Sequence, residues 1–255
     1  MKITFLGTGT SQGIPVIGSN HPVCLSKNLK DKRLRSSIQI EVNNTVLVVD
    51  CGPDFRQQML RENVQKIDAL LFTHEHSDHT AGLDEVRPFY FKQGKFTVCA
   101  DARVQNSLKK RFAYIFETEN KYPGTPTLTM NLIENNVDFK INDIQITPIE
   151  VLHGKLPIFG FRIQNFAYLT DVKTIVASEI KKLKGVDVLV VNALREEPHH
   201  SHFSLTEALA FIEAVKPKKA YLTHVSHMLG FHEEVQKSLP KNVFLAYDTL
   251  TLTSN

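Results

Sequence analysis

The stretch His74-Glu75-His76-Ser77-Asp78-His79 follows directly on the apolar run 69–73. Such a run predicts a buried strand, so the motif lies where a strand ends and the chain turns. In an extended segment the first two histidines share one face, and the turn carries the aspartate and the last histidine to other positions. Four metal-ligating side chains within six residues predict a site for two neighbouring divalent ions. The alternative, a polar loop whose histidines only form hydrogen bonds, is less favoured by so dense a set of ligands.

Two metal ions need more ligands than one loop supplies, and the sequence offers further ones. His153, Asp171 and His224 each follow another apolar run. Any one of them alone could be a hydrogen-bonded buried group. Because each stands at a predicted strand end, we expect all three to converge with the motif. The predicted metal ligands are therefore His74, His76, Asp78, His79, His153, Asp171 and His224.

Around these residues the chain alternates short β-branched and apolar runs with amphipathic stretches, a pattern typical of a layered α/β fold. Strands are expected at residues 3–6, 37–42, 45–50, 69–73, 96–100, 144–151, 159–163, 166–170, 186–192, 219–223 and 243–246. Helices are expected at residues 54–63, 102–112, 172–182, 205–215 and 233–239. Ser204 and Glu207 predict a capping box for the fourth helix, and Asn43-Asn44 predicts a hairpin turn. Since no linker rich in Pro, Gly or Ser divides the chain, we expect a single domain over residues 1–255.

The composition limits the class of protein. Of 255 residues, 42% are hydrophobic, which is enough for one sizeable core. The 30 Lys and Arg residues against 27 Asp and Glu residues give a formal net charge of only +3, so no stable complex with nucleic acid is expected. Three widely spaced cysteines, Cys24, Cys51 and Cys99, argue against a disulfide framework and for a reducing compartment. The chain shows no signal peptide and no membrane-spanning run, so we expect a cytoplasmic protein with no membrane partner.

Taken with Leu6-Gly7-Thr8-Gly9-Thr10-Ser11, Asp50 and Leu169-Thr170-Asp171, the motif resembles that of the metallo-β-lactamase-fold hydrolases. The resemblance covers nearly the whole chain. It implies a four-layer αβ/βα sandwich with two metal ions at one edge, between the two sheets. By the family pattern, the first ion is held by His74, His76 and His153, the second by Asp78, His79 and His224, with Asp171 bridging them.

Within that superfamily the chain is most similar to the cyclic phosphodiesterases of the carbon-phosphorus lyase pathway, which are related to the tRNA 3′-processing endonucleases. The similarity rests on Gly13-Ile14-Pro15, His153-Gly154-Lys155-Leu156 leading to Phe159-Gly160, His202 ahead of Leu205, and Thr223-His224-Val225-Ser226-His227. His202 matches an extra histidine that the phosphodiesterases carry near the metals, although a solvated histidine in the run 199–202 is the alternative. The resemblance leaves a homodimer open.

These relatives also hold a separate structural zinc ion with three cysteines and one histidine. The corresponding positions here are Ser19, His21, Cys24 and His227. Cys24 with the two histidines, His21 and His227, could still bind zinc with water as the fourth ligand. A closed structural site prefers four protein ligands, so this zinc ion is a weaker expectation than the two-metal centre.

The charges of the predicted centre favour an anionic substrate. Two divalent ions bring four positive charges; ionised Asp78 and Asp171 and a bridging hydroxide leave about +1. A phosphodiester with one negative charge matches this centre. We expect attack by the bridging hydroxide on phosphorus, with Asp78 and His202 as catalytic residues, His202 giving a hydrogen bond or proton to the substrate. Asp50 is the predicted acceptor for the N–H of a ligating histidine, with Asp248 as a second candidate.

The predicted function is hydrolysis of a small cyclic or nucleotide-like phosphodiester with two divalent ions, zinc or manganese. RNA processing is the runner-up, but the glycine-rich basic arm of the family nucleases has no counterpart in the sequence. Thioester, lactone or lactam hydrolysis gains less from the charge of the centre. A non-catalytic metalloprotein is the remaining alternative, and a complete ligand set argues against it.

Overall fold

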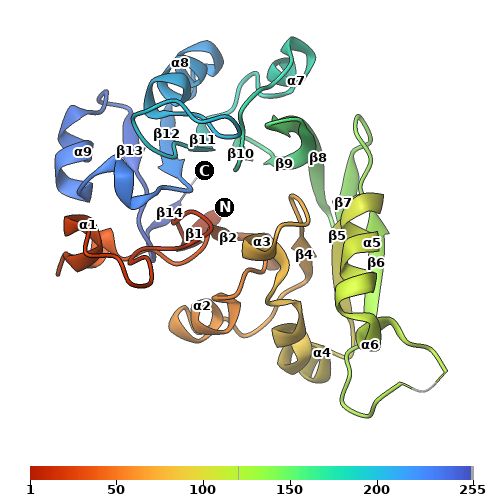
Figure 1. The fold of residues 1–255 in the computed structure, drawn as a ribbon. Coiled ribbons are helices and arrows are strands. Elements are labelled where there is room, and N and C mark those ends of the chain that lie inside the picture. Colours follow the sequence, from red (N-terminus) through yellow and green to blue (C-terminus); the bar gives the residue numbers. More distant parts are fainter. Residues whose placement is uncertain (120, 254–255) are drawn as a thin grey trace.

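The computed structural model describes residues 1–119 and 121–253, and its strands form two seven-stranded sheets (Figure 1). The first sheet has the order β14-β1-β2-β3-β4-β5-β6 and the second the order β13-β12-β11-β10-β9-β8-β7. The strands of the first sheet are β1 (Lys2–Gly7), β2 (Ser37–Val42), β3 (Thr45–Val49), β4 (Ala69–Leu71), β5 (Phe96–Ala100), β6 (Leu128–Leu132) and β14 (Thr251–Thr253). Those of the second are β7 (Phe139–Ile141), β8 (Ile144–His153), β9 (Leu156–Ile163), β10 (Phe166–Tyr168), β11 (Val188–Asn192), β12 (Lys219–Thr223) and β13 (Val243–Leu245).

Each sheet changes from antiparallel to parallel pairing part of the way across. In the first sheet β3 to β6 are parallel neighbours, and in the second β10 to β13 are. The carboxyl ends of parallel neighbours lie at the same edge of a sheet, where ligand sites of α/β folds form. The topology therefore brings residues that follow several separate strands to a common edge.

Helices cover the outer face of each sheet. The α-helices are α1 (Pro22–Leu25), α2 (Phe55–Arg61), α3 (Ser77–Thr80), α4 (Arg87–Gln93), α5 (Ala102–Arg111), α6 (Ala113–Phe116), α7 (Ala177–Lys182), α8 (Leu205–Val215) and α9 (His232–Ser238). Within the described residues, 3₁₀ turns lie at Leu29–Asp31, Leu83–Val86 and His227–Leu229. Apolar side chains of α2, α4 and α5 pack on the first sheet, and those of α8 and α9 pack on the second. The four-layer sandwich predicted from the sequence is confirmed.

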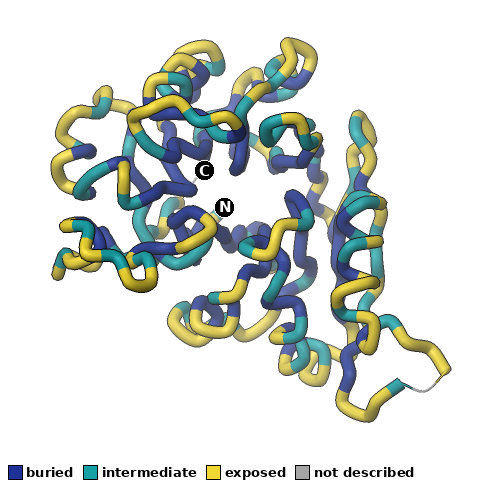
Figure 2. The backbone as a smooth tube through the Cα atoms, viewed as in Figure 1, coloured by how far each residue is buried: buried dark blue, intermediate teal, exposed yellow. Residues whose placement is uncertain are grey.

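The central strands are buried on both faces, whereas the edge strands β6, β7 and β14 are partly exposed; in Figure 2 the middle of each sheet is dark blue and the outer surfaces of the helices are mostly yellow. In β3, Leu47 and Val49 point into the core between the sheets, while Val48 points toward the helices. In β4, Leu71 points into the core between the sheets and Leu70 points toward the helices. A strand covered on both faces reads as a continuous apolar run, which is why these segments were recognisable in the sequence.

Several predicted elements are confirmed and others need correction. α8 begins with the predicted capping box, and the Asn43-Asn44 turn joins β2 to β3 with both residues at positive φ. The helix expected over 172–182 begins only at Ala177, because the preceding backbone is used elsewhere: Val172 N–H donates to Asn192 and the residues after it bridge to β8. The short strands β6, β7 and β14 were not predicted, since three to five residues carry little periodicity.

No helix among the described residues is both long enough and apolar enough to cross a membrane.

Candidate metal centre

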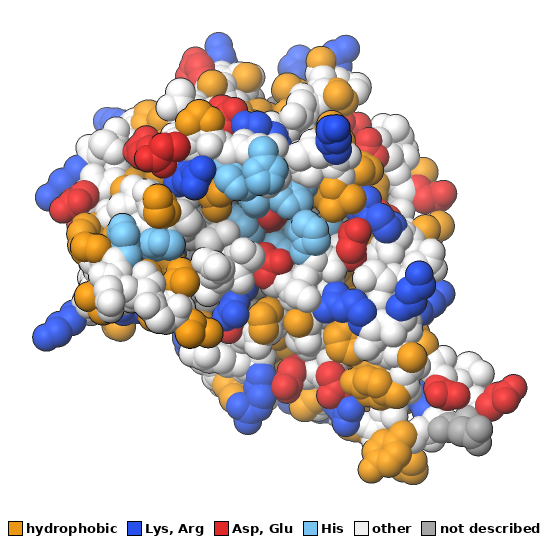
Figure 3. All heavy atoms as spheres, in the orientation of Figure 1, with side chains coloured by type: hydrophobic (Ala, Val, Ile, Leu, Met, Phe, Trp, Pro, Cys, Tyr) orange, Lys and Arg blue, Asp and Glu red, His pale blue; other side chains and the backbone are white. Residues whose placement is uncertain are grey.

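The predicted ligands lie at the carboxyl ends of strands from both sheets. The motif follows β4, His153 is the last residue of β8, Asp171 lies three residues beyond β10, and His224 directly follows β12. Figure 3 shows histidine side chains gathered on one face with carboxylates among them. All seven residues therefore meet at one edge, although they are distributed over 151 positions of the chain (from 74 to 224).

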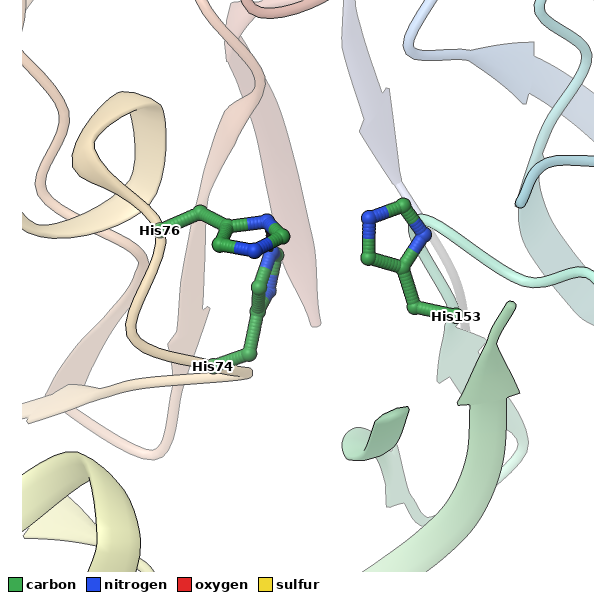
Figure 4. A group of neighbouring side chains, drawn as sticks. All are labelled: His74, His76 and His153. Carbon is green, nitrogen blue, oxygen red and sulfur yellow. Dashed lines mark hydrogen bonds between the residues drawn. The ribbon is translucent and has the colours of Figure 1, made fainter. Parts of the chain in front are cut away.

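The first group consists of His74, His76 and His153, whose candidate ligand atoms all lie within 4.8 Å of one another. Figure 4 shows the two motif histidines on one side and His153 facing them from the other. His74 Nε2 lies 3.0 Å from His76 Nδ1. His153 Nδ1 lies 2.9 Å from the carbonyl oxygen of Ser201, which can only accept, so the neutral ring keeps its Nε2 lone pair for a metal ion.

The second group is arranged around the carboxylate of Asp171. Its Oδ1 lies 2.9 Å from His202 Nε2 and 3.3 Å from His224 Nε2, and its Oδ2 lies 3.4 Å from His79 Nε2. Asp171 forms one tight triplet with His74 and His79 and another with His153 and His202. The carboxylate thus lies between the groups that the family pattern assigns to the two ions.

The carboxylate of Asp50 orients two of the histidines, one directly and one through Thr73. His79 Nδ1 donates to Asp50 Oδ2 at 2.7 Å, so Nε2 is the nitrogen left to face the other ligands and a metal ion. The hydroxyl of Thr73 donates to the same carboxylate, so it accepts from His74 Nδ1 at 2.9 Å. Asp50 therefore lies where the sequence analysis places the acceptor, and it reaches a second histidine through Thr73.

The electrostatics of the centre favour a cation. Burial works against charge on His79, but Asp78, Asp50 and Asp171 outweigh it and hold its pKa well above the ordinary value. Burial lowers the pKa of His74 well below the ordinary value and that of His224 to about 4, so both rings are neutral, the form that binds metal. Burial opposes ionisation of Asp171, yet His224 and His79 hold its pKa well below the ordinary range.

A divalent ion fits this arrangement. His79 Nε2 is buried without a hydrogen-bond partner and lies 3.2 Å from Asp78 Oδ2. Because the pKa of His79 is raised, this nitrogen carries a proton between the ring and the carboxylates when no metal is bound, and a divalent ion can take the place of that proton. The imidazole and carboxylate donors suit zinc, manganese and other first-row ions.

The backbone of the centre is held in an uncommon conformation. Asp50, Asp171 and His224 have positive φ values of 64°, 58° and 53°. Residues other than glycine rarely adopt this region, and such residues cluster at functional sites where the surrounding structure fixes them. The turn comes directly after β3 at Asp50 and after β12 at His224, and three residues beyond β10 at Asp171, and it redirects each side chain into the centre.

The motif loop packs directly on Gly52. A Cβ atom at this position would lie 2.0 Å from the carbonyl oxygen of Asp78, a backbone atom that cannot rotate away. Gly52→Ala is therefore expected to displace α3 and to lower the metal content, which elemental analysis of the purified protein measures. Gly94→Ala is the control, because its Cβ would meet nothing within 4 Å and only its φ of 73° opposes the change. Equal metal content in the two variants would contradict this account.

The two remaining candidates, His202 and Asp248, lie in different surroundings. His202 lies at the centre, with its side chain 12% exposed and its Nε2 on Asp171. Asp248 does not serve a histidine: its carboxylate accepts from Thr8, Leu34 and Arg61 and ties the chain near its C-terminal end to the loop after β1. Its role is structural.

The candidate structural zinc site is only partly assembled. The rings of His21 and His227 lie 4.9 Å apart between centroids, and His227 Nδ1 is buried without a partner. Cys24 Sγ accepts from the backbone N–H of Val16, and Ser19 Oγ accepts from that of His21. Within the described part of the chain these residues do not form a triplet of ligand atoms within 4.8 Å of one another. Zinc binding here stays a prediction.

Sequence reasoning missed the hydroxyl groups that support the centre. Thr73 contacts His74, Thr170 Oγ1 donates to Asp171 Oδ2 at 2.7 Å, and Thr10 Oγ1 lies 3.2 Å from His224 Nε2. A threonine precedes His74, Asp171 and His224 in the sequence, and this recurrence is the signal that could have revealed two of these contacts.

Comparison with known proteins identifies the family. The model of the beta-lactamase superfamily domain matches residues 45–225, a span that contains all seven predicted ligands. The chain therefore belongs to the beta-lactamase superfamily.

The relatives refine this assignment. The chain resembles a solved structure described as a new diphosphatase from the PhnP family, with 36% identity and a TM-score of 0.93 over 100% of this chain and 98% of that one. It is 38% identical over 98% of its length to an octanoyltransferase of Porphyromonas gingivalis, and 28% identical over 64% of its length to ribonuclease Z of Bacillus subtilis. The chain spans about half the length of these two curated relatives, 51% and 49%. The resemblance predicted from the sequence is confirmed.

Proposed function

We propose that this protein is a phosphodiesterase that uses two divalent metal ions, zinc or manganese. His74, His76 and His153 would hold the first ion, Asp78, His79 and His224 the second, and Asp171 would contact both. The observation that carries the proposal is the position of Asp171, whose two oxygens lie within 3.4 Å of ring nitrogens from three histidines, one of them His202. When bound, the ions would supply charge stabilisation at phosphorus and lower the pKa of a water nucleophile to about 7.

The residues of this chain would bind and orient the substrate. Asp78 and Asp171 offset two of the four positive charges of the ions, so the centre stays positive and attracts an anionic phosphodiester. His202 is the predicted contact to the phosphoryl or leaving oxygen. Its Nε2 faces the centre and its side chain is 12% exposed. The hydrogen bond or proton that it gives would contribute about 10² to 10⁴ in rate.

The diphosphatase relative supports a small phosphorus ester or anhydride as the substrate. The ribonuclease Z relative makes RNA processing the second candidate, but a formal net charge of +3 gives little electrostatic attraction for a long polyanion. The octanoyltransferase relative adds a third possibility, an octanoyl thioester. A neutral thioester gains less from a positive centre than a phosphodiester does.

The test is a panel of substrates offered to the protein loaded with zinc or with manganese. The panel contains a bis-aryl phosphate, a cyclic ribose phosphate, a 2′,3′-cyclic nucleotide, a nucleoside diphosphate, a precursor tRNA, a chromogenic lactam and an octanoyl thioester. We expect kcat/KM for a small phosphodiester to exceed that for the lactam and the thioester by at least about tenfold, or 1.4 kcal/mol. A preference for the nucleoside diphosphate, the precursor tRNA, the thioester or the lactam would refute the proposal.

A further inference from the structure

The loop between β11 and α8 contacts the candidate centre at two points. Ser201 is buried, and its carbonyl oxygen accepts from His153 Nδ1 at 2.9 Å. Its hydroxyl oxygen lies 3.0 Å from His202 Nδ1. One residue therefore touches both a predicted metal ligand and the histidine predicted to contact phosphate.

His199 contacts the same edge of the His202 ring. Its Nδ1 lies 3.1 Å from His202 Nδ1 and 3.3 Å from the backbone nitrogen of Ser201. A backbone N–H can only donate, so His199 Nδ1 is an acceptor, and His202 Nδ1 must be the donor in the contact between the two rings. Burial, followed by the nearby His202, lowers the pKa of His199 to about 4, so at neutral pH this ring keeps the acceptor.

The two contacts fix the rotation of the His202 ring. With its Nδ1 edge against His199 and Ser201, its opposite nitrogen, Nε2, points at the Asp171 carboxylate 2.9 Å away. Without these contacts the ring could rotate about its side-chain bonds toward solvent, and Nε2 would leave the centre. A ring that is already held in this orientation loses no conformational entropy when the substrate binds.

We propose that His199 is a positioning residue, which together with Ser201 holds the Nδ1 edge of His202 so that Nε2 faces the metal centre. The inference rests on the proposed function, because it concerns the histidine assigned to the phosphoryl group. His199 itself would not contact the substrate.

The chain provides a matched control. His200 is exposed, its ring packs 4.3 Å from that of His199 between centroids, and it makes no hydrogen bond to His202 among the described residues. Replacing it changes the same loop and removes the same side-chain type. His199→Asn is the rescue variant, because asparagine Oδ1 stands one bond from Cγ as histidine Nδ1 does and can accept from the Ser201 N–H.

The kinetic experiment uses the full chain loaded with zinc and the best small phosphorus substrate. We expect His199→Ala to lower kcat about 10- to 100-fold with unchanged metal content, His199→Asn to recover most of the loss, and His200→Ala to match the unsubstituted protein. In a His202→Ala background, His199→Ala should cost nothing more, since its effect passes through His202. A further loss in that background, or an equal loss in His200→Ala, would overturn the proposal.

A measurement that needs no substrate separates this inference from the proposed function. In long-range ¹H–¹⁵N spectra of the histidine rings, His199→Ala should move the Nδ1 resonance of His202, and His200→Ala should leave it in place. If the resonance moves but no phosphorus compound is hydrolysed, the positioning stands and the proposed function fails. An unmoved resonance in His199→Ala overturns the positioning, whatever the enzyme hydrolyses.

Discussion

Asp171→Asn is expected to release at least one of two bound metal ions and to lower phosphodiester hydrolysis about 10³-fold or more. The side chain is 3% exposed and lies among His79, His202 and His224. Asparagine keeps its shape but removes the negative charge that would neutralise the ions. Charge stabilisation by a metal ion contributes several kcal/mol, and each 1.36 kcal/mol corresponds to tenfold in rate. Elemental analysis and kcat/KM measure the two effects.

The matched control for Asp171→Asn is Asp143→Asn. Asp143 is an exposed turn residue that accepts from Asn43 at 3.3 Å, and its loss removes one carboxylate from the surface. Circular dichroism should show both variants folded. Full metal content together with an unchanged rate in Asp171→Asn would remove this residue from the centre, and with it the account of a shared carboxylate.

His202→Ala is expected to lower kcat about 10²- to 10⁴-fold while the metal content stays that of the unsubstituted protein. The physical reason is the loss of the only hydrogen-bond donor that the proposal aims at the phosphoryl or leaving oxygen. His200→Ala, in the same loop and exposed, is the comparison.

Two outcomes of the His202 experiment would contradict its assigned role. An unchanged kcat would show that His202 takes no part in the reaction. A fall in metal content would make it a ligand, an alternative that its tight triplet with His153 and Asp171 makes worth measuring.

The sequence predicted where the centre lies because strand ends are local features. His153, Asp171 and His224 each follow an apolar run, and the structure has His153 as the last residue of β8, His224 directly after β12 and Asp171 three residues beyond β10. Burial on both faces made these runs continuous and easy to recognise. The parallel pairing that aligns their ends follows from the topology.

The supporting contacts were beyond sequence reasoning because they join residues far apart. Ser201 and His153 are 48 positions apart, and Thr10 and His224 are 214 apart. The same holds for the late start of α7, where Val172 gives its backbone N–H to Asn192 instead of to a helix. A single chain without its tertiary contacts carries no signal for such pairs.

The candidate centre draws its side chains from both sheets, His74 beyond β4 in one and His153 on β8 in the other. A cation bound by ligands from both sheets would cross-link the two halves of the sandwich. Its binding site is formed only while the chain is folded. Mass action then adds about 2.7 kcal/mol of protection when free metal is a hundredfold above its dissociation constant. The melting temperature of this protein should therefore rise with the concentration of free metal ion. Removal of the metal would lower the stability of the fold as well as the activity.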